Sequence, residues 1–282
     1  MKARSLKHAA LFATLVLSLV ITAEATTVQL PASKDTTLYQ SNPNNGAGGA
    51  PGFLAGTNSQ LSIRRALVAF DTSSIPSNAT ITDVQLRLVI GQIAGAGGSG
   101  GGLSAPIIDL HKLLVNWGEA NTGASTATNL NGIGQGSAAL AGDATWNDRF
   151  FGASQPWSSP GGQSGADYTA GASASLAQSN NVNDVSLWFS TPALVADVQG
   201  WLAAPATNFG WMLINQDESA AQTFRGFYSR NFNPNPPPAN LQSLFPKLIV
   251  TYLVPEPTSL GMMALGLAVL GAIARKRKRV VA

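Results

Sequence analysis

The sequence contains no cysteine, only two histidines and few charged residues. The absence of cysteine excludes a disulfide scaffold and all cysteine-based metal or nucleophile chemistry. Two histidines and no cysteine also leave no H-E-x-x-H or Cys/His zinc pattern. Charged residues make up 11% of the 282 residues, against ~25% in typical soluble domains. Glycine (29) and proline (16) are abundant instead, so we expect a neutral, loop-rich body that is not helical.

The basic charge of the sequence is confined to its two ends. The formal net charge is +3, yet residues 2–7 and 275–279 carry eight of the 17 basic residues. Between residues 26 and 254, nine basic residues face twelve acidic ones. The body is therefore slightly acidic, and no nucleic-acid partner is expected.

The N-terminus has the three parts of a secretory signal peptide. Basic residues at positions 2–7 precede an apolar run at 9–23 and an Ala-Glu-Ala site ending at Ala25. The alternative is a permanent anchor, but the run is shorter than the ~20 residues of a spanning helix. We expect residues 1–25 to form a signal helix that signal peptidase removes after Ala25.

The C-terminus combines a proline-containing element, an apolar run and a basic tail. Residues 260–274 carry no charge; as a helix they span about 22 Å, less than the ~30 Å hydrocarbon core. The basic residues at 275–279 predict a marginal transmembrane helix with its tail in the cytoplasm and the body outside. Before it, Pro255, Glu256 and Pro257 form an extended segment just outside the bilayer, where a membrane protease can reach it.

This three-part order resembles the PEP-CTERM sorting signal, here covering residues 254–282. In that family a membrane-embedded exosortase recognises the Pro-Glu-Pro element and removes the tail. The resemblance implies exosortase as a partner, an inner-membrane-anchored intermediate and then a cell-surface or extracellular location in a Gram-negative bacterium. The alternative is a linker followed by a permanent tail anchor.

The body reads as short strands separated by turn residues. In residues 83–90, Val84, Leu86, Leu88 and Ile90 face one way and the polar residues between them face the other. The other expected strands are 28–30, 36–39, 64–70, 107–115, 185–190, 210–214, 223–228 and 247–253. This all-β pattern predicts an antiparallel β-sandwich, a jelly roll, in one domain over residues 26–253.

One short helix interrupts the strands. Thr191 and Pro192 supply its N-cap and first position, an apolar stripe follows at helical spacing, and Pro205 ends it. Residues 94–102 read as a flexible loop. Residues 121–181, rich in Gly, Ala, Ser and Asn, are either an insertion that carries function or a disordered surface segment.

The body also resembles the DNRLRE-type domain of secreted bacterial proteins. The segments that carry the resemblance, in order, are 35–38, 64–71, 74–76, 81–88, 117–119, 144–147, 198–201, 208–211, 227–230 and 246–248. That family is a jelly-roll sandwich related to carbohydrate-binding modules, including alginate binders. The chain departs from it in the glycine- and alanine-rich insertion.

Candidate catalytic groups are few. His111 and Asp109 lie on one strand face, but no G-x-S-x-G accompanies them, so a solvated strand-face histidine is the favoured interpretation. Asp217 and Glu218 form the one adjacent acidic pair, yet such neighbours point oppositely on a strand and more often meet an arginine such as Arg225. We expect no enzyme activity; a polysaccharide lyase or hydrolase is the alternative.

Binding residues are predicted from residue type. No cofactor is required, although Asn215, Asp217 and Glu218 offer oxygen ligands for calcium. Trp157 and Tyr168, in the polar insertion, are the candidates for exposed rings that stack on sugars.

An arginine pair adds a charge-based candidate. Of Arg64 and Arg65, at most one can face an anionic polysaccharide, because neighbours on a strand alternate. The sequence therefore predicts an exported, non-enzymatic module that binds extracellular polysaccharide or has a structural role. A protein–protein module of the envelope is the third alternative.

Overall fold

The computed structural model describes residues 24–95, 105–125, 127–254 and 266–267. The chain divides into the unit Ala25–Pro255 and a second unit made of its two ends. Within the described ranges, no helix is long and apolar enough to cross a membrane. Most of two expected helices lies outside these ranges: the signal helix except residues 24–25 and the transmembrane helix at 260–274 except residues 266–267. The Pro255, Glu256 and Pro257 element lies outside them as well.

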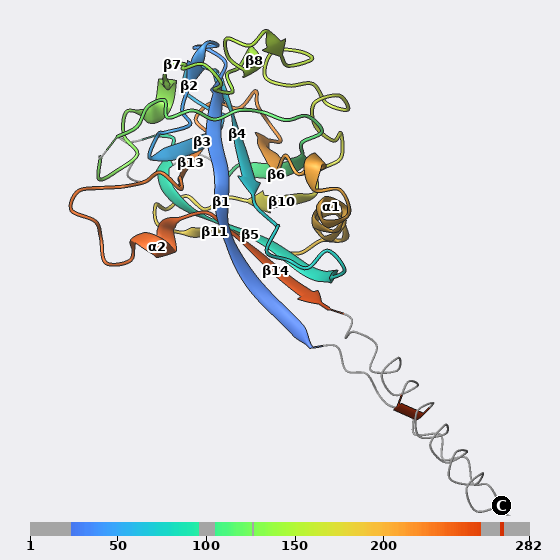
Figure 1. Cartoon of the computed structure of the whole chain (residues 1–282). Helices are drawn as coiled ribbons and strands as arrows, with labels where there is room; N and C mark the ends of the chain where they lie inside the picture. Colours follow the sequence, from blue (N-terminus) through green and yellow to red (C-terminus); the bar gives the residue numbers. More distant parts are fainter. Residues whose placement is uncertain (1–23, 96–104, 126, 255–265, 268–282) are drawn as a thin grey trace, which may run out of the picture. The chain divides into compact units, whose positions relative to one another are not determined.

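The unit Ala25–Pro255 is all-β, and every strand pairing in it is antiparallel (Figure 1). Its main sheet comprises β1 (Ala25–Tyr39), β3 (Gly52–Thr57), β4 (Ile63–Phe70), β5 (Thr80–Ile93), β6 (Ile107–Lys112), β10 (Ala174–Ala177), β11 (Val185–Trp188), β12 (Trp211–Asn215), β13 (Arg225–Tyr228) and β14 (Lys247–Leu253). Two short pairs accompany it, β2 (Asn45–Gly46) with β7 (Ser137–Ala138) and β8 (Asp148–Phe150) with β9 (Gln155–Pro156). The expected all-β antiparallel architecture is confirmed.

The long strand β1 pairs with a different strand along each half of its length (Figure 1). Its first half pairs with β14, from Ala25 opposite Leu253 to Pro31 opposite Lys247. After a register shift its second half pairs with β4, ending at Tyr39 opposite Arg64. The pairings β1–β14–β5–β13–β3–β4–β1 form a closed circuit, and β12, β6 and β10 extend it from β4. The sheet therefore folds over on itself and encloses its apolar faces.

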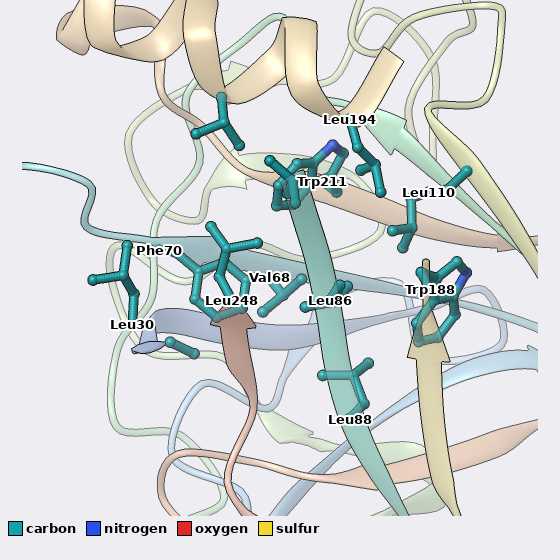
Figure 2. Close-up of a cluster of buried hydrophobic side chains, with 14 of the residues drawn as sticks. Leu30, Val68, Phe70, Leu86, Leu88, Leu110, Trp188, Leu194, Trp211 and Leu248 are labelled. Carbon is teal, nitrogen blue, oxygen red and sulfur yellow. The ribbon is translucent and has the colours of Figure 1, made fainter. Parts of the chain in front are cut away.

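The main core lies inside the folded sheet, and the alternating apolar side chains of β5 point into it. Val84, Leu86, Leu88 and Ile90 are fully buried, as the alternation predicts. Figure 2 shows two of them among apolar side chains from six other strands and one helix. Burying each such side chain stabilises the fold by roughly 1.5–3 kcal/mol.

The helix α1 (Pro192–Ala203) begins and ends as expected. Thr191 is its N-cap, and its Oγ1 accepts a hydrogen bond from the Leu194 backbone N–H at 3.0 Å. Its buried stripe includes Val198 and Trp201, which join the main core. Further helical turns of the described body are α2 (Leu241–Leu244) and the 3₁₀ turns η2 (Ile133–Gln135) and η3 (Pro205–Thr207).

The described part of the insertion at 121–181 is packed against the outer face of β4 and β12. Its aromatic side chains meet Leu67 and Met212 from those strands in a second apolar cluster. Two buried carboxylates organise its loops. Asp143 accepts hydrogen bonds from the backbone N–H groups of Ala120 and Leu140, and Asp167 accepts them from two further backbone N–H groups. The described part of this segment is therefore packed, and the expectation of a disordered surface segment is wrong for it.

Candidate functional site

Arg64 is a nearly buried cation at the start of β4. Its side chain is folded over two backbone carbonyls: Nε and Nη2 donate to Gly134 O at 3.1 and 2.6 Å, and Nη1 donates to Ser62 O at 2.6 Å. Arg64 is 3% exposed, and burial lowers the pKa of its guanidinium below the usual range. No carboxylate of the described residues lies within 4.0 Å of it.

A guanidinium carries five N–H donors, and three of them are used here. Two donors and the positive charge therefore have no partner among the described residues. A planar guanidinium matches the two oxygens of a carboxylate. The site at Arg64 is thus suited to an acidic group.

Arg64 lines a groove of about 580 Å³ whose other polar groups are mostly side-chain amides. These amides belong to Asn58, Gln60, Gln92, Gln135 and Gln222. The half-buried ring of Phe224 adds an apolar wall. Amides both donate and accept hydrogen bonds, so this lining suits a ligand that carries many hydroxyl groups.

Arg65, the neighbour of Arg64 on β4, faces the opposite way and makes four hydrogen bonds. Its guanidinium forms a two-bond pair with Glu218 at 2.8 and 2.7 Å and donates to the carbonyls of Gly161 and Gly162. It also lies 5.6 Å from the ring of Trp146. Arg65 therefore holds the insertion onto the sheet, which agrees with the expectation that only one of the two arginines faces a given groove.

A second charged cluster joins β1 to two loops. Glu119 accepts from the Asp35 backbone N–H at 2.8 Å and from the Arg230 guanidinium, while Asp35 Oδ2 accepts from the Arg230 backbone N–H at 2.9 Å. Lys34 donates to Trp117 O and lies over the Trp117 ring at 4.2 Å. Three segments that carry the DNRLRE resemblance, 35–38, 117–119 and 227–230, thus contact one another here.

Burial controls the charge of Asp35. This side chain is 1% exposed, and Oδ1 has no hydrogen-bond partner in the described part of the chain. Burial raises the pKa of Asp35 to about 8, opposed by the hydrogen bond from Arg230. Burial likewise raises the pKa of Glu119. Asp35 therefore holds its proton to higher pH than a free carboxyl does.

Trp157 and Tyr168 are not the exposed rings that the sequence predicts. They are 3% and 8% exposed. The Trp157 indole N–H donates to Thr145 O at 2.8 Å, and the Tyr168 ring packs edge-on against His111 at 5.3 Å. Both rings form the apolar centre of the insertion, so neither offers a free face to a sugar.

The three residues predicted to bind calcium contact other protein groups. The Glu218 carboxylate is paired with Arg65, not Arg225, and Oδ1 of Asp217 accepts from Ser219 N and Oγ. The Asn215 amide nitrogen donates to Asp217 O at 2.6 Å. Within the described ranges, no three acidic or histidine side chains gather as metal ligands. Calcium binding at these residues stays a prediction.

His111 is fixed by packing. Its Nδ1 lies 2.8 Å from Thr169 O, and its Nε2 lies 4.0 Å from Asp109 Oδ2. It is buried beside Tyr168 and is therefore not the solvated strand-face histidine that the sequence predicts.

Ala25 begins β1 opposite Leu253, so the predicted cleavage after Ala25 leaves that strand starting at Thr26.

Comparison with known proteins identifies one segment of the chain. Residues 253–278 match the family described as the PEP-CTERM protein-sorting motif. This motif marks an exported protein that is sorted by an exosortase and passes through a membrane-anchored intermediate. No curated protein matches the chain.

Proposed function

We propose that this exported, exosortase-sorted protein is a non-enzymatic module that binds acidic polysaccharide in the Arg64 groove. The observation that carries the proposal is a nearly buried guanidinium without a carboxylate partner among the described residues, in a groove rimmed by amides. A uronic-acid polymer has carboxylates for the guanidinium and hydroxyls for the amides.

Two further considerations support the proposal. The resemblance to DNRLRE-type domains adds a jelly-roll sandwich related to carbohydrate-binding modules. Sorting by an exosortase would release such a module at the surface of, or outside, a Gram-negative cell, where extracellular polysaccharide is found. Signal peptidase would act first, after Ala25.

A glycine in the groove allows a test that leaves Arg64 in place. A Cβ added at Gly134 meets no atom within 4 Å, and the Gly134 carbonyl that Arg64 uses is retained in any substitution. Gly134→Glu places a carboxylate in the groove. Gly171→Glu is the matched control, because it makes the same change at an equally open position away from the groove.

The assay is retention of the full-length chain, in a detergent without a sugar headgroup, on immobilised polyuronates and neutral glycans. We expect the unchanged chain and Gly171→Glu to bind polyuronate, and Gly134→Glu to bind at least about 10-fold more weakly, because one charge-assisted contact contributes ~1.5–3 kcal/mol. Lack of retention on every polysaccharide would leave a structural or protein–protein role. Release of reducing ends or unsaturated products would favour the lyase or hydrolase alternative.

A further inference from the structure

A second groove lies beside Arg230. It measures about 880 Å³ and is lined by the amides of Asn121, Asn231, Asn233 and Gln242 together with the aromatic side chains of Phe232 and Phe245. It thus combines the same kinds of groups as the Arg64 groove: an arginine, several amides and an aromatic wall. Such linings suit hydroxyl-rich ligands.

The polar groups of this second groove differ in whether the protein already pairs them. The side chain of Arg230 is 37% exposed and its guanidinium is paired with Glu119. Asn233 and Gln242 are exposed, and their side chains make no hydrogen bond within the described part of the chain. Because Glu119 balances the charge of Arg230, this groove suits the neutral hydroxyl face of a polymer, while the Arg64 groove suits a carboxylate.

A smaller hollow of about 150 Å³ connects the linings of the two grooves. Ser125 lines both this hollow and the Arg230 groove. Gly132 and Ile133 line the hollow, and the next two residues, Gly134 and Gln135, line the Arg64 groove. Residues 121–125 therefore contribute to the Arg230 groove and the hollow, and residues 131–137 contribute to the hollow and the Arg64 groove.

We infer that the Arg230 groove is a second subsite, so that one polysaccharide chain is held at both grooves along residues 121–125 and 131–137. This inference rests on the proposed function and adds a site to it. Two linked contacts on one polymer strengthen binding by up to about 10²–10⁴-fold, because the second contact is intramolecular. Long chains therefore bind more tightly than short ones that reach a single groove.

The test compares a sized series of polyuronate oligosaccharides, titrated calorimetrically into the full-length chain in the same detergent. The variant Asn233→Ala/Gln242→Ala removes two exposed amides from the second groove. Gln155→Ala/Gln163→Ala is the matched control, since it removes two exposed amides outside both grooves.

We expect the unchanged chain to bind long oligosaccharides at least about 10-fold more tightly than short ones, with one long chain per protein molecule. The groove variant should lose this gain for long chains and bind short ones normally, while the control keeps both. Equal affinity for long and short chains, two long chains per protein, or an unaffected groove variant would overturn the second subsite alone. Absence of binding at every length would overturn the proposed function as well.

Discussion

Replacing Asp35 by asparagine should change how stability depends on pH. The Asp35 carboxyl is buried, and Oδ2 accepts a hydrogen bond from the Arg230 backbone N–H at 2.9 Å. An asparagine side-chain oxygen can accept the same bond, and its amide nitrogen takes the place of Oδ1, which has no partner in the described part of the chain. The substitution therefore removes the titration of Asp35 with little change in shape.

The magnitude follows from the raised pKa. The pKa of Asp35 is about 8 in the folded chain, against 3.8 for an unperturbed carboxyl. Between these two pKa values the unfolded chain loses the Asp35 proton while the folded chain keeps it. The free energy of unfolding therefore falls as pH rises from the unfolded pKa to the folded pKa. At 1.36 kcal/mol for each pKa unit, the chain loses up to about 4 kcal/mol through Asp35 between pH 4 and pH 7. The loss continues until about pH 8.

The assay is denaturant-induced unfolding of the unchanged chain and of Asp35→Asn across pH 4 to 9. We expect similar free energies of unfolding at pH 4 and a growing advantage for Asp35→Asn up to about pH 8. Asp71→Asn is the control, because hydrogen bonds from Ser73 lower the pKa of that exposed carboxyl. Its effect on stability is complete by about pH 5, so its difference from the unchanged chain should stay nearly constant from there to pH 9. A difference between Asp35→Asn and the unchanged chain that does not vary with pH would refute the reasoning.

Three further predictions concern the insertion, the helix and the C-terminus. Arg65→Met should lower the free energy of unfolding by about 3 kcal/mol, because it leaves a half-buried Glu218 carboxylate unpaired; urea unfolding measures this, and an unchanged value would contradict it. Thr191→Ala should cost about 1 kcal/mol by loss of the N-cap, and Thr191→Ser should restore most of it. Alanine at 255–257 should leave the chain in the membrane fraction with residues 275–279 attached. Mass spectrometry of the C-terminus checks this, and a processed tail in that variant would count against recognition of the motif.

The regular elements were predictable because local patterns determine them. In β5 the alternation of Val84, Leu86 and Leu88 with polar residues matches the two sides of a half-buried strand. In α1 the cap at Thr191 and the apolar stripe act within one helix. Strand β3 (Gly52–Thr57) was missed, because it is buried on both faces and shows neither alternation nor strong strand propensity.

The grooves could not be predicted from local patterns. The amides around Arg64 come from four separated segments: the β3–β4 turn, the end of β5, η2 and the β12–β13 loop. No spacing in the sequence relates them. The sequence did single out the pair Arg64 and Arg65. Because neighbours on a strand alternate, it predicted that at most one of them faces the groove, and only Arg64 does.

The insertion explains both the failed ligand prediction and the proposed site. Its composition suggests disorder, yet Asp143 and Asp167 hold its loops by accepting hydrogen bonds from two backbone N–H groups each. Once the loops are held in this way, Trp157 and Tyr168 are buried beneath them. Its described polar stretches then line the grooves that open on the surface. The aromatic residues of this insertion therefore mark where it packs against the sheet, while its small and amide residues line the surface grooves.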